Sequence, residues 1–250
     1  TVNQDELKES HLVQLFNRFA TYNGSSPFKT PGMMTLIQHL EQEYGTFVSE
    51  KGMINISNSI YDLAKRNGVK FEFNKLVNEI VVKNNKVVGV KVNNTVIESD
   101  FVVSNMDIVP TYKKLLKKSY QPKKVLNQER SSSALIFYWG IKKTFKNLEL
   151  HNILFSNNYK KEFDSIFELG TISDDPTIYI NITSKDVDSD APKESENWFV
   201  MINSPNDTGQ DWDEIIKTVR KNTINKINRT LNIDIESFIE FEKVFSPKTI

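Results

Sequence analysis

Two asparagine pairs divide one stretch of the chain into three short apolar segments, and this pattern limits the folds that the stretch can adopt. The segments are residues 76–82, 87–92 and 95–97, separated by Asn84-Asn85 and Asn93-Asn94. Asparagine tolerates the positive backbone φ that two-residue hairpin turns require. The sequence therefore predicts a three-stranded meander with two turns of the same chemistry.

The segments on either side of this meander predict a helix and two further strands. Residues 53–66 carry apolar side chains at helical spacing, and Asn67-Gly68 is a typical C-cap. Residues 69–73 alternate between apolar and polar side chains, as in a strand. Residues 100–105 contain an apolar run that stops abruptly in polar residues, so we expect a short buried strand there. The predicted order is helix, strand, meander, strand.

The N-terminal part of the chain predicts a helical hairpin. Residues 6–22 present one apolar stripe at helical spacing. Residues 23–27 are a dense cluster of turn formers, and Thr30-Pro31 introduces a second helix that continues through Leu40.

The C-terminal part predicts a sheet covered by helices. Residues 134–139 are apolar without interruption, which favours a central strand. Three more strands are expected, at residues 152–155, 177–183 and 198–203. Helices are expected at residues 111–118, 160–167 and 211–231. We therefore assign the chain to the α/β class, with a mixed sheet that has helices on one face.

Composition excludes several classes of function. The 250 residues contain 32 basic and 32 acidic side chains, so no net field attracts nucleic acid. The lack of cysteine removes thiolate catalysis and zinc–thiolate sites, and three scattered histidines give no metal-binding pattern. No apolar run approaches the roughly 18 residues of a membrane-spanning helix. We expect a cytoplasmic protein without a metal site, and because Thr1 is not Met we expect this chain to be a piece of a longer one.

Two features remain open between a structural and a functional interpretation. Six lysines lie between residues 113 and 124; they form either a solvated helix face or a contact with anionic lipid. Aromatic residues occur in several separate segments, including Phe137 to Trp139, Phe155 and Tyr179. They suit core packing, and they also suit the walls of an apolar tunnel.

Several segments, in order, resemble the FAD-dependent carotenoid desaturases, the phytoene desaturase type within the flavin amine oxidase superfamily. The matching stretches are residues 15–28, 50–53, 102–107, 151–156 and 175–179. Three stretches are most similar to the 1-hydroxycarotenoid 3,4-desaturase branch: RFATY (18–22), FYWG (137–140) and ENWFVMINSPN (196–206). The glycine-rich nucleotide segments at the two ends of family members are not present, so the chain resembles only the central part.

The resemblance implies a domain organisation and a set of cofactor contacts. It places residues 1–46 and 109–250 in the substrate domain and residues 47–108 in part of a Rossmann-like FAD-binding domain. It places Gly52 and Met53 near the cofactor, although Lys51 replaces the first glycine of the family's pair. Val77 would offer its main chain to the adenine, and Ser104 and Asn105 would end a strand at the nucleotide edge. Each of these residues has an alternative role in packing or turns.

The resemblance also implies the reaction and its partners. Two hydrogens would leave a C–C bond of a polyene, with a hydride passing to flavin N5, so no acid–base pair is required and no catalytic side chain is assigned. Four aromatic residues are candidate contacts for the carotenoid: Phe137, Trp139, Phe155 and Tyr179. We expect peripheral membrane contact through the hairpin of residues 6–43, with the lysine-rich segment as the weaker candidate. The alternatives are an amine oxidase-like flavoenzyme and a non-catalytic module that binds an apolar ligand.

Overall fold

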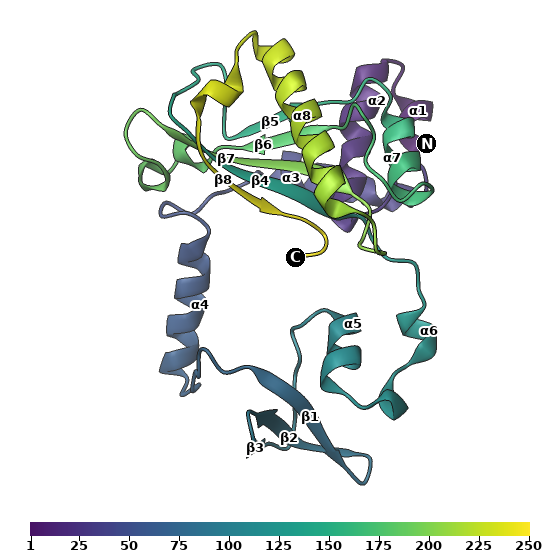
Figure 1. Ribbon diagram of the computed structural model, residues 1–250, viewed down its shortest axis with the longest axis vertical. Helices are drawn as coiled ribbons and strands as arrows, with labels where there is room; N and C mark the ends of the chain where they lie inside the picture. Colours follow the sequence, from purple (N-terminus) through teal and green to yellow (C-terminus); the bar gives the residue numbers. More distant parts are fainter. The chain divides into compact units, whose positions relative to one another are not determined.

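The computed structural model describes residues 1–250 and divides them into two compact units (Figure 1). Unit 1 contains residues 1–58 and 130–250, and unit 2 contains residues 59–129. The chain passes from unit 1 into unit 2 within helix α4 (Ile54–Arg66), which matches the helix predicted at residues 53–66.

Unit 1 is built on a five-stranded sheet in the order β5-β6-β7-β4-β8. The strands are β4 (Ser133–Ile141), β5 (His151–Leu154), β6 (Ile178–Asn181), β7 (Glu196–Ser204) and β8 (Ile239–Phe245). The α/β class and the internal position of β4 are confirmed. The mixed sheet is wrong, because every strand pair is antiparallel. Strand β8, which the sequence pattern did not predict, pairs with β4 on the side away from β7.

One face of this sheet is closed by helix α8 (Trp212–Leu231), which crosses the strands (Figure 1). Alternate residues of β4 and β7 point into this layer, and their side chains pack with the apolar face of α8; they include Leu135, Phe137, Trp139, Trp198, Val200 and Ile202, none more than 1% exposed. Full burial of a large apolar side chain contributes about 1.5–3 kcal/mol. This layer is the hydrophobic core of unit 1.

The N-terminal helices of unit 1 differ from the prediction in one respect. The helix expected over residues 6–22 is interrupted: α1 (Val2–Glu6) ends before α2 (Ser10–Asn17), which continues as the 3₁₀ helix η1 (Arg18–Asn23). The break arises because Leu7 is extended and the Glu9 carboxylate accepts a hydrogen bond from the Leu12 N–H, so that a new helix begins there.

The second helix of the hairpin is confirmed as a short 3₁₀ turn, η2 (Gly32–Met34), followed by α3 (Thr35–Tyr44). The Tyr22 hydroxyl donates a 2.9 Å hydrogen bond to Glu41, which joins η1 to α3. Helix α7 (Tyr159–Phe167) also matches its prediction, and short 3₁₀ segments follow β6 and precede β8: Thr183–Lys185, Asp188–Asp190 and Ile235–Phe238.

Unit 2 contains the predicted meander. Strands β1 (Val77–Lys83), β2 (Lys86–Val92) and β3 (Thr95–Glu98) pair in order, all antiparallel. Asn84, Asn85 and Asn93 have φ values of 48°, 58° and 52°, as the turn chemistry predicted. At Gly89 a Cβ would lie 2.1 Å from the Ile97 carbonyl oxygen, so only glycine allows β3 to approach β2 this closely.

The remaining predictions for unit 2 need correction. Residues 69–73 and 100–105 are not strands, and Phe101 and Val103 are 85% and 92% exposed. A strand requires a hydrogen-bonded neighbour, and no segment of this chain pairs with either stretch. The helix expected at 111–118 is a turn of α-helix, α5 (Ile108–Pro110), and a π-helical turn (Thr111–Leu115), because Leu116 is extended. Short helices follow at Lys118–Tyr120 and Lys123–Leu126 (α6).

Candidate functional site

A row of aromatic rings crosses the face of the unit 1 sheet that α8 does not cover. Tyr179 on β6 lies 6.3 Å from Phe199 on β7, measured between ring centroids. Phe199 lies 5.3 Å from Tyr138 on β4, which in turn lies 5.5 Å from Phe245 on β8. These four rings, which we call the aromatic row, are half-buried or exposed. They form a continuous apolar strip suited to an elongated hydrophobic ligand.

A pocket of about 530 Å³ opens at the β6 end of the aromatic row. Part of its lining is apolar and part is polar. The apolar part includes Phe47, Val48, Met53, Leu150 and Phe199; the polar part includes His151, Asn181, Thr183 and Asp186, with Tyr179 between them. Such a pocket is suited to a ligand that has an apolar body and a polar group.

Strand pairing brings three polar side chains of this pocket together. His151 lies opposite Asn181 in the β5–β6 ladder, and Tyr179 lies two residues before Asn181 on the same face. The Tyr179 hydroxyl is 2.7 Å from His151 Nδ1, and the Asn181 amide nitrogen is 3.3 Å from the same atom. The amide nitrogen also donates to the Leu150 carbonyl at 3.0 Å, which fixes the orientation of the Asn181 side chain.

The electrostatics of this cluster keep Tyr179 neutral. Burial raises the pKa of the Tyr179 phenol, and the effect outweighs the opposing influence of the Arg18 guanidinium and of the Asn181 amide. The guanidinium carbon of Arg18 lies 5.2 Å from the centre of the Tyr179 ring, within cation–π distance. Tyr179 is therefore a hydroxyl donor at neutral pH.

The predicted cofactor residues lie in different environments. Met53 lines the pocket, and Gly52, with φ of 76°, has open space where a Cβ would be. Val77 is the first residue of β1. Ser104 shares a 2.9 Å hydrogen bond with Thr111, and Asn105 is exposed. Gly52 and Met53 belong to unit 1, whereas the other three belong to unit 2. The cofactor role of each stays a prediction.

The four aromatic residues predicted to contact substrate do not share one surface. Tyr179 lies in the aromatic row and the pocket. Phe137 and Trp139 are 0% and 1% exposed in the closed core, and the Trp139 indole donates a 2.5 Å hydrogen bond to Glu242. The ring of Phe155 is half-buried, 6.0 Å from that of Tyr159. The geometry therefore favours Tyr179 as a ligand contact and packing roles for Phe137 and Trp139.

The other residues of this surface were not predicted from the sequence. Tyr138 and Phe199 stand next to core residues in their strands, and a strand alternates its two faces. The alternation in β4 and β7 was a usable signal, but it does not show which face is covered. Only the position of α8 distinguishes them.

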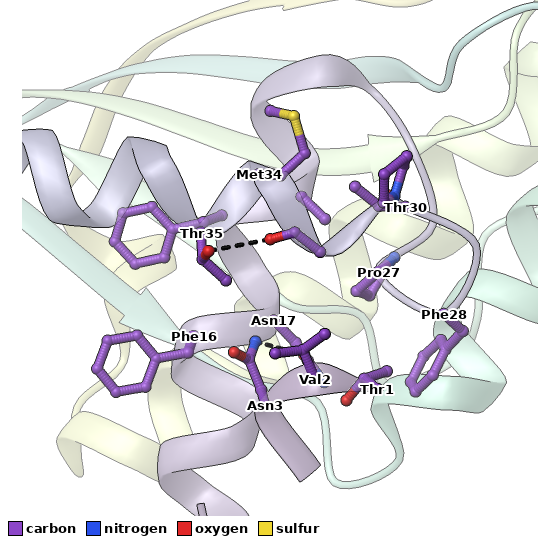
Figure 2. A pocket seen from close by; sticks show the side chains of 14 residues that line it. Thr1, Val2, Asn3, Phe16, Asn17, Pro27, Phe28, Thr30, Met34 and Thr35 are labelled. Atoms are coloured by element: carbon purple, nitrogen blue, oxygen red, sulfur yellow. Dashed lines mark hydrogen bonds between the residues drawn. The ribbon is translucent and has the colours of Figure 1, made fainter. Parts of the chain in front are cut away.

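A smaller hollow of about 140 Å³ lies among the N-terminal helices (Figure 2). The Asn3 amide donates to Asn17 at 2.9 Å, and the Thr35 hydroxyl donates to the Gly32 carbonyl at 2.9 Å. No acidic, basic or histidine side chain lines this hollow. We assign it to packing of the helical hairpin.

This architecture has a counterpart among solved structures. A crystal structure of an oxidoreductase from Methanosarcina mazei superposes with a TM-score of 0.67 at 12% sequence identity, covering 97% of this chain and 54% of that one. The similarity shows the fold. The model of the family described as flavin containing amine oxidoreductase matches residues 2–139. The chain belongs to this family, which confirms the resemblance to the flavin amine oxidase superfamily.

The chain is also similar in sequence to carotenoid-modifying enzymes. The chain is 53% identical over its full length to a protein of Flavobacterium sp. (strain P99-3) named 1-hydroxycarotenoid 3,4-desaturase, and covers 52% of that protein. It is 29% identical to a phytoene desaturase of Fusarium fujikuroi, covering 95% of this chain and 46% of the relative. It is also 29% identical to a 4,4'-diapolycopene oxygenase of Methylomonas sp, covering 98% and 50%. The chain spans about half the length of these relatives.

Proposed function

We propose that the full-length protein is an FAD-dependent carotenoid desaturase of the 1-hydroxycarotenoid 3,4-desaturase type. The observation that carries this proposal is the 53% identity to that enzyme over the whole of this chain. Bound FAD would supply the hydride acceptor: one hydrogen of a CH–CH unit would leave as a hydride to the flavin, the other would leave as a proton to water, and the C–H electron pair left by that proton would form the new double bond.

The aromatic row and the pocket supply what such a reaction needs from the protein. A polyene is long, flat and apolar, and the row offers rings 5.3–6.3 Å apart across four strands. Packing against these rings would hold the chain of carbons in one orientation and exclude water from it. Tyr179 and Phe155 remain the proposed substrate contacts from the sequence, and Tyr138, Phe199 and Phe245 join them.

The exposed surfaces of unit 2 fit a role in holding FAD. Helix α4 and the segment 101–103 leave large apolar side chains exposed: Ile60 at 62%, Leu63 at 52%, Phe101 at 85% and Val103 at 92%. Apolar surfaces of this kind favour burial against another layer. We propose that residues 47–108 form part of a flavin domain completed by other parts of the full-length protein. The proposed FAD contacts remain those that the family resemblance implies, Gly52 and Met53 in unit 1 and Val77, Ser104 and Asn105 in unit 2.

A carotenoid substrate partitions into lipid, so we also propose peripheral contact with a membrane from the cytoplasmic side. No helix is long and apolar enough to cross a bilayer. Helix α3 instead exposes an apolar stripe, formed by Leu36, Leu40 and Tyr44, which are 55%, 44% and 71% exposed. These residues lie at i, i+4 and i+8, on one face of the helix. The six lysines between residues 113 and 124 are exposed and form a second candidate.

The test of this function is expression of the full-length protein, followed by measurement of flavin content and of product. The purified protein should show bound FAD by absorbance and mass spectrometry. Incubation with an acyclic 1-hydroxycarotenoid should lengthen the conjugated system by one double bond, which shifts the visible absorption to longer wavelength. A flavin-free protein, or a flavoprotein that oxidises amines and leaves the carotenoid unchanged, would overturn the proposal.

A further inference from the structure

In the polar part of the pocket, the contacts fix which atoms donate hydrogen bonds and which accept them. The Asn181 amide nitrogen can only donate, and it lies 3.3 Å from His151 Nδ1. Its orientation is set independently by the bond to the Leu150 carbonyl. The Tyr179 hydroxyl, 2.7 Å from Nδ1, is protonated and can also donate. Two donors face Nδ1, so this nitrogen is the acceptor, and the tautomer that fits this arrangement carries its proton on Nε2.

Two polar atoms of the cluster then have no partner within the chain. Nε2 of His151 is left as a donor, and Oδ1 of Asn181 is left as an acceptor. Both residues line the pocket. A hydroxyl group both accepts and donates, and so it would satisfy this pair with one group.

We propose that His151, Tyr179 and Asn181 form a hydroxyl-recognition site that binds the alcohol of a hydroxylated polyene, with the apolar chain extending along the aromatic row. This inference rests on the proposed function and names the residues that select its substrate. His151 and Asn181 contact the alcohol. The Tyr179 hydroxyl acts through His151, whose tautomer it holds, while the Tyr179 ring remains a contact for the polyene.

The pocket gives this site selectivity against hydrocarbon ligands. A hydrocarbon end would displace water from His151 and Asn181 without replacing the hydrogen bonds, and a buried polar group left unpaired is strongly unfavourable. Sites that hydrogen-bond a substrate hydroxyl therefore reject analogues that lack it much more strongly than apolar pockets reject an added methylene. The apolar lining from Phe47, Val48 and Leu150 accepts the carbons beside the hydroxyl.

The experiment compares two ligands in the full-length flavoprotein: an acyclic carotenoid with a tertiary hydroxyl at C1, and the same carbon skeleton without it. Asn181→Leu removes the acceptor, and Tyr179→Phe removes the tautomer lock but keeps the ring. We expect each variant to lower the ratio of kcat/KM for the hydroxylated over the hydrocarbon substrate by about 5- to 150-fold, the loss of one hydrogen bond to the bound alcohol. Activity on the hydrocarbon should fall much less.

Tyr120→Phe is the matched control, because it removes an exposed phenol outside both the pocket and the aromatic row and should leave this ratio unchanged. Flavin content and circular dichroism establish that each variant is folded. Equilibrium binding of both ligands, followed by tryptophan fluorescence, gives the same ratio without turnover. Wild-type protein that prefers the hydroxylated ligand, with variants that keep the full preference, overturns the inference and leaves the desaturase proposal standing. Selective binding without any desaturation overturns the proposed function and leaves the recognition site standing.

Discussion

The ammonium of Lys226 on α8 lies 2.8 Å from Oδ1 of Asp175, a residue 51 positions earlier in the loop before β6. Lys226 is only 6% exposed, and it also donates to the Pro176 carbonyl at 2.8 Å. The carboxylate of Asp175 in turn accepts the backbone N–H of Asn157. This buried cation therefore ties the central helix to two loops at one end of the sheet.

Replacing Lys226 by Met should destabilise unit 1. The methionine keeps the buried apolar stem but leaves the Pro176 carbonyl without its donor, so we expect a loss of about 1–3 kcal/mol. Chemical denaturation of the full-length protein measures this loss of unfolding free energy. Lys221→Met is the control, because Lys221 lies on the same helix and is exposed. Equal stabilities of the two variants would contradict the structural role of Lys226.

The contribution of this ion pair to the free energy of unfolding should decrease at low pH. Burial alone would raise the pKa of Asp175, but the Asn157 N–H and the Lys226 ammonium together lower it below its ordinary value of 3.8. A lowered acid pKa contributes stability above the unfolded value, and that contribution is lost as the pH falls through the folded value. The wild type should therefore lose more stability than Lys226→Met below about pH 4, measured by urea denaturation.

Glu162 on α7 should show the opposite pH dependence. Burial raises the pKa of its carboxyl, and one oxygen, Oε1, has no partner, while Oε2 accepts the Thr177 hydroxyl at 2.6 Å. A raised acid pKa means that the folded state binds the proton more tightly, so stability falls as the pH rises above the ordinary value of 4.5.

Glu162→Gln should remove this decline, since the amide is neutral and can still accept from Thr177. Urea midpoints at about pH 5 and pH 8 should differ less in the variant than in the wild type. Glu168→Gln removes a carboxylate at the end of the same helix that is exposed, and it should leave the slope unchanged. A slope identical in wild type and Glu162→Gln would show that the carboxyl titrates as if it were in water.

The sequence identified those elements whose local signal agrees with their tertiary surroundings. Asn84-Asn85 formed the predicted turn, and the uninterrupted apolar run of β4 indicated an internal strand because both of its faces are at least partly covered. The stretch around Phe101 and Val103 carries the same strand signal, yet no strand formed, because pairing depends on a neighbour and not on composition. The site was only partly predictable: Tyr179 was found, but its partners His151 and Asn181 meet through the register of β5 and β6.

The meander offers a sharp test of close backbone approach. Gly89→Ala would place a Cβ 2.1 Å from the Ile97 carbonyl oxygen, so β2 and β3 must separate. We expect a loss of about 2 kcal/mol or more in unit 2. Gly68→Ala is the matched control: its φ is also positive, at 82°, but its Cβ meets nothing within 4 Å, so only backbone strain of about 1 kcal/mol applies. Hydrogen exchange of the β2 and β3 amides distinguishes the two variants, because only Gly89→Ala should accelerate exchange in both strands.

The α3 stripe makes the membrane proposal testable. Leu36→Asp and Leu40→Asp place a charge on the exposed apolar face, and each should reduce binding of the full-length protein to sedimenting vesicles of mixed phosphatidylcholine and phosphatidylglycerol. Gln42→Asp adds the same charge to α3 outside the stripe and should retain more binding. If instead only Lys113→Glu and Lys117→Glu abolish binding, the contact is electrostatic and belongs to the lysine segment.

Substitution of Phe137 separates a core role from a contact with substrate. Phe137 is fully buried against α8, so Phe137→Ala leaves a cavity and should cost about 3–5 kcal/mol in unfolding free energy. Tyr138→Ala changes the next residue, which is 40% exposed in the aromatic row. It should cost less stability and instead raise KM for the carotenoid.

Thermal unfolding and steady-state kinetics of the full-length enzyme therefore distinguish the two variants. Phe137→Ala should lower stability, and Tyr138→Ala should mainly raise KM. Any folded Phe137→Ala protein should keep the wild-type KM, because the lost ring lies on the α8 side of the sheet, away from the aromatic row. A Phe137→Ala enzyme with wild-type stability and an altered carotenoid preference would place the substrate on the α8 side. That result would reverse the assignment of the two faces and remove the basis for a ligand path along Tyr138 and Phe199.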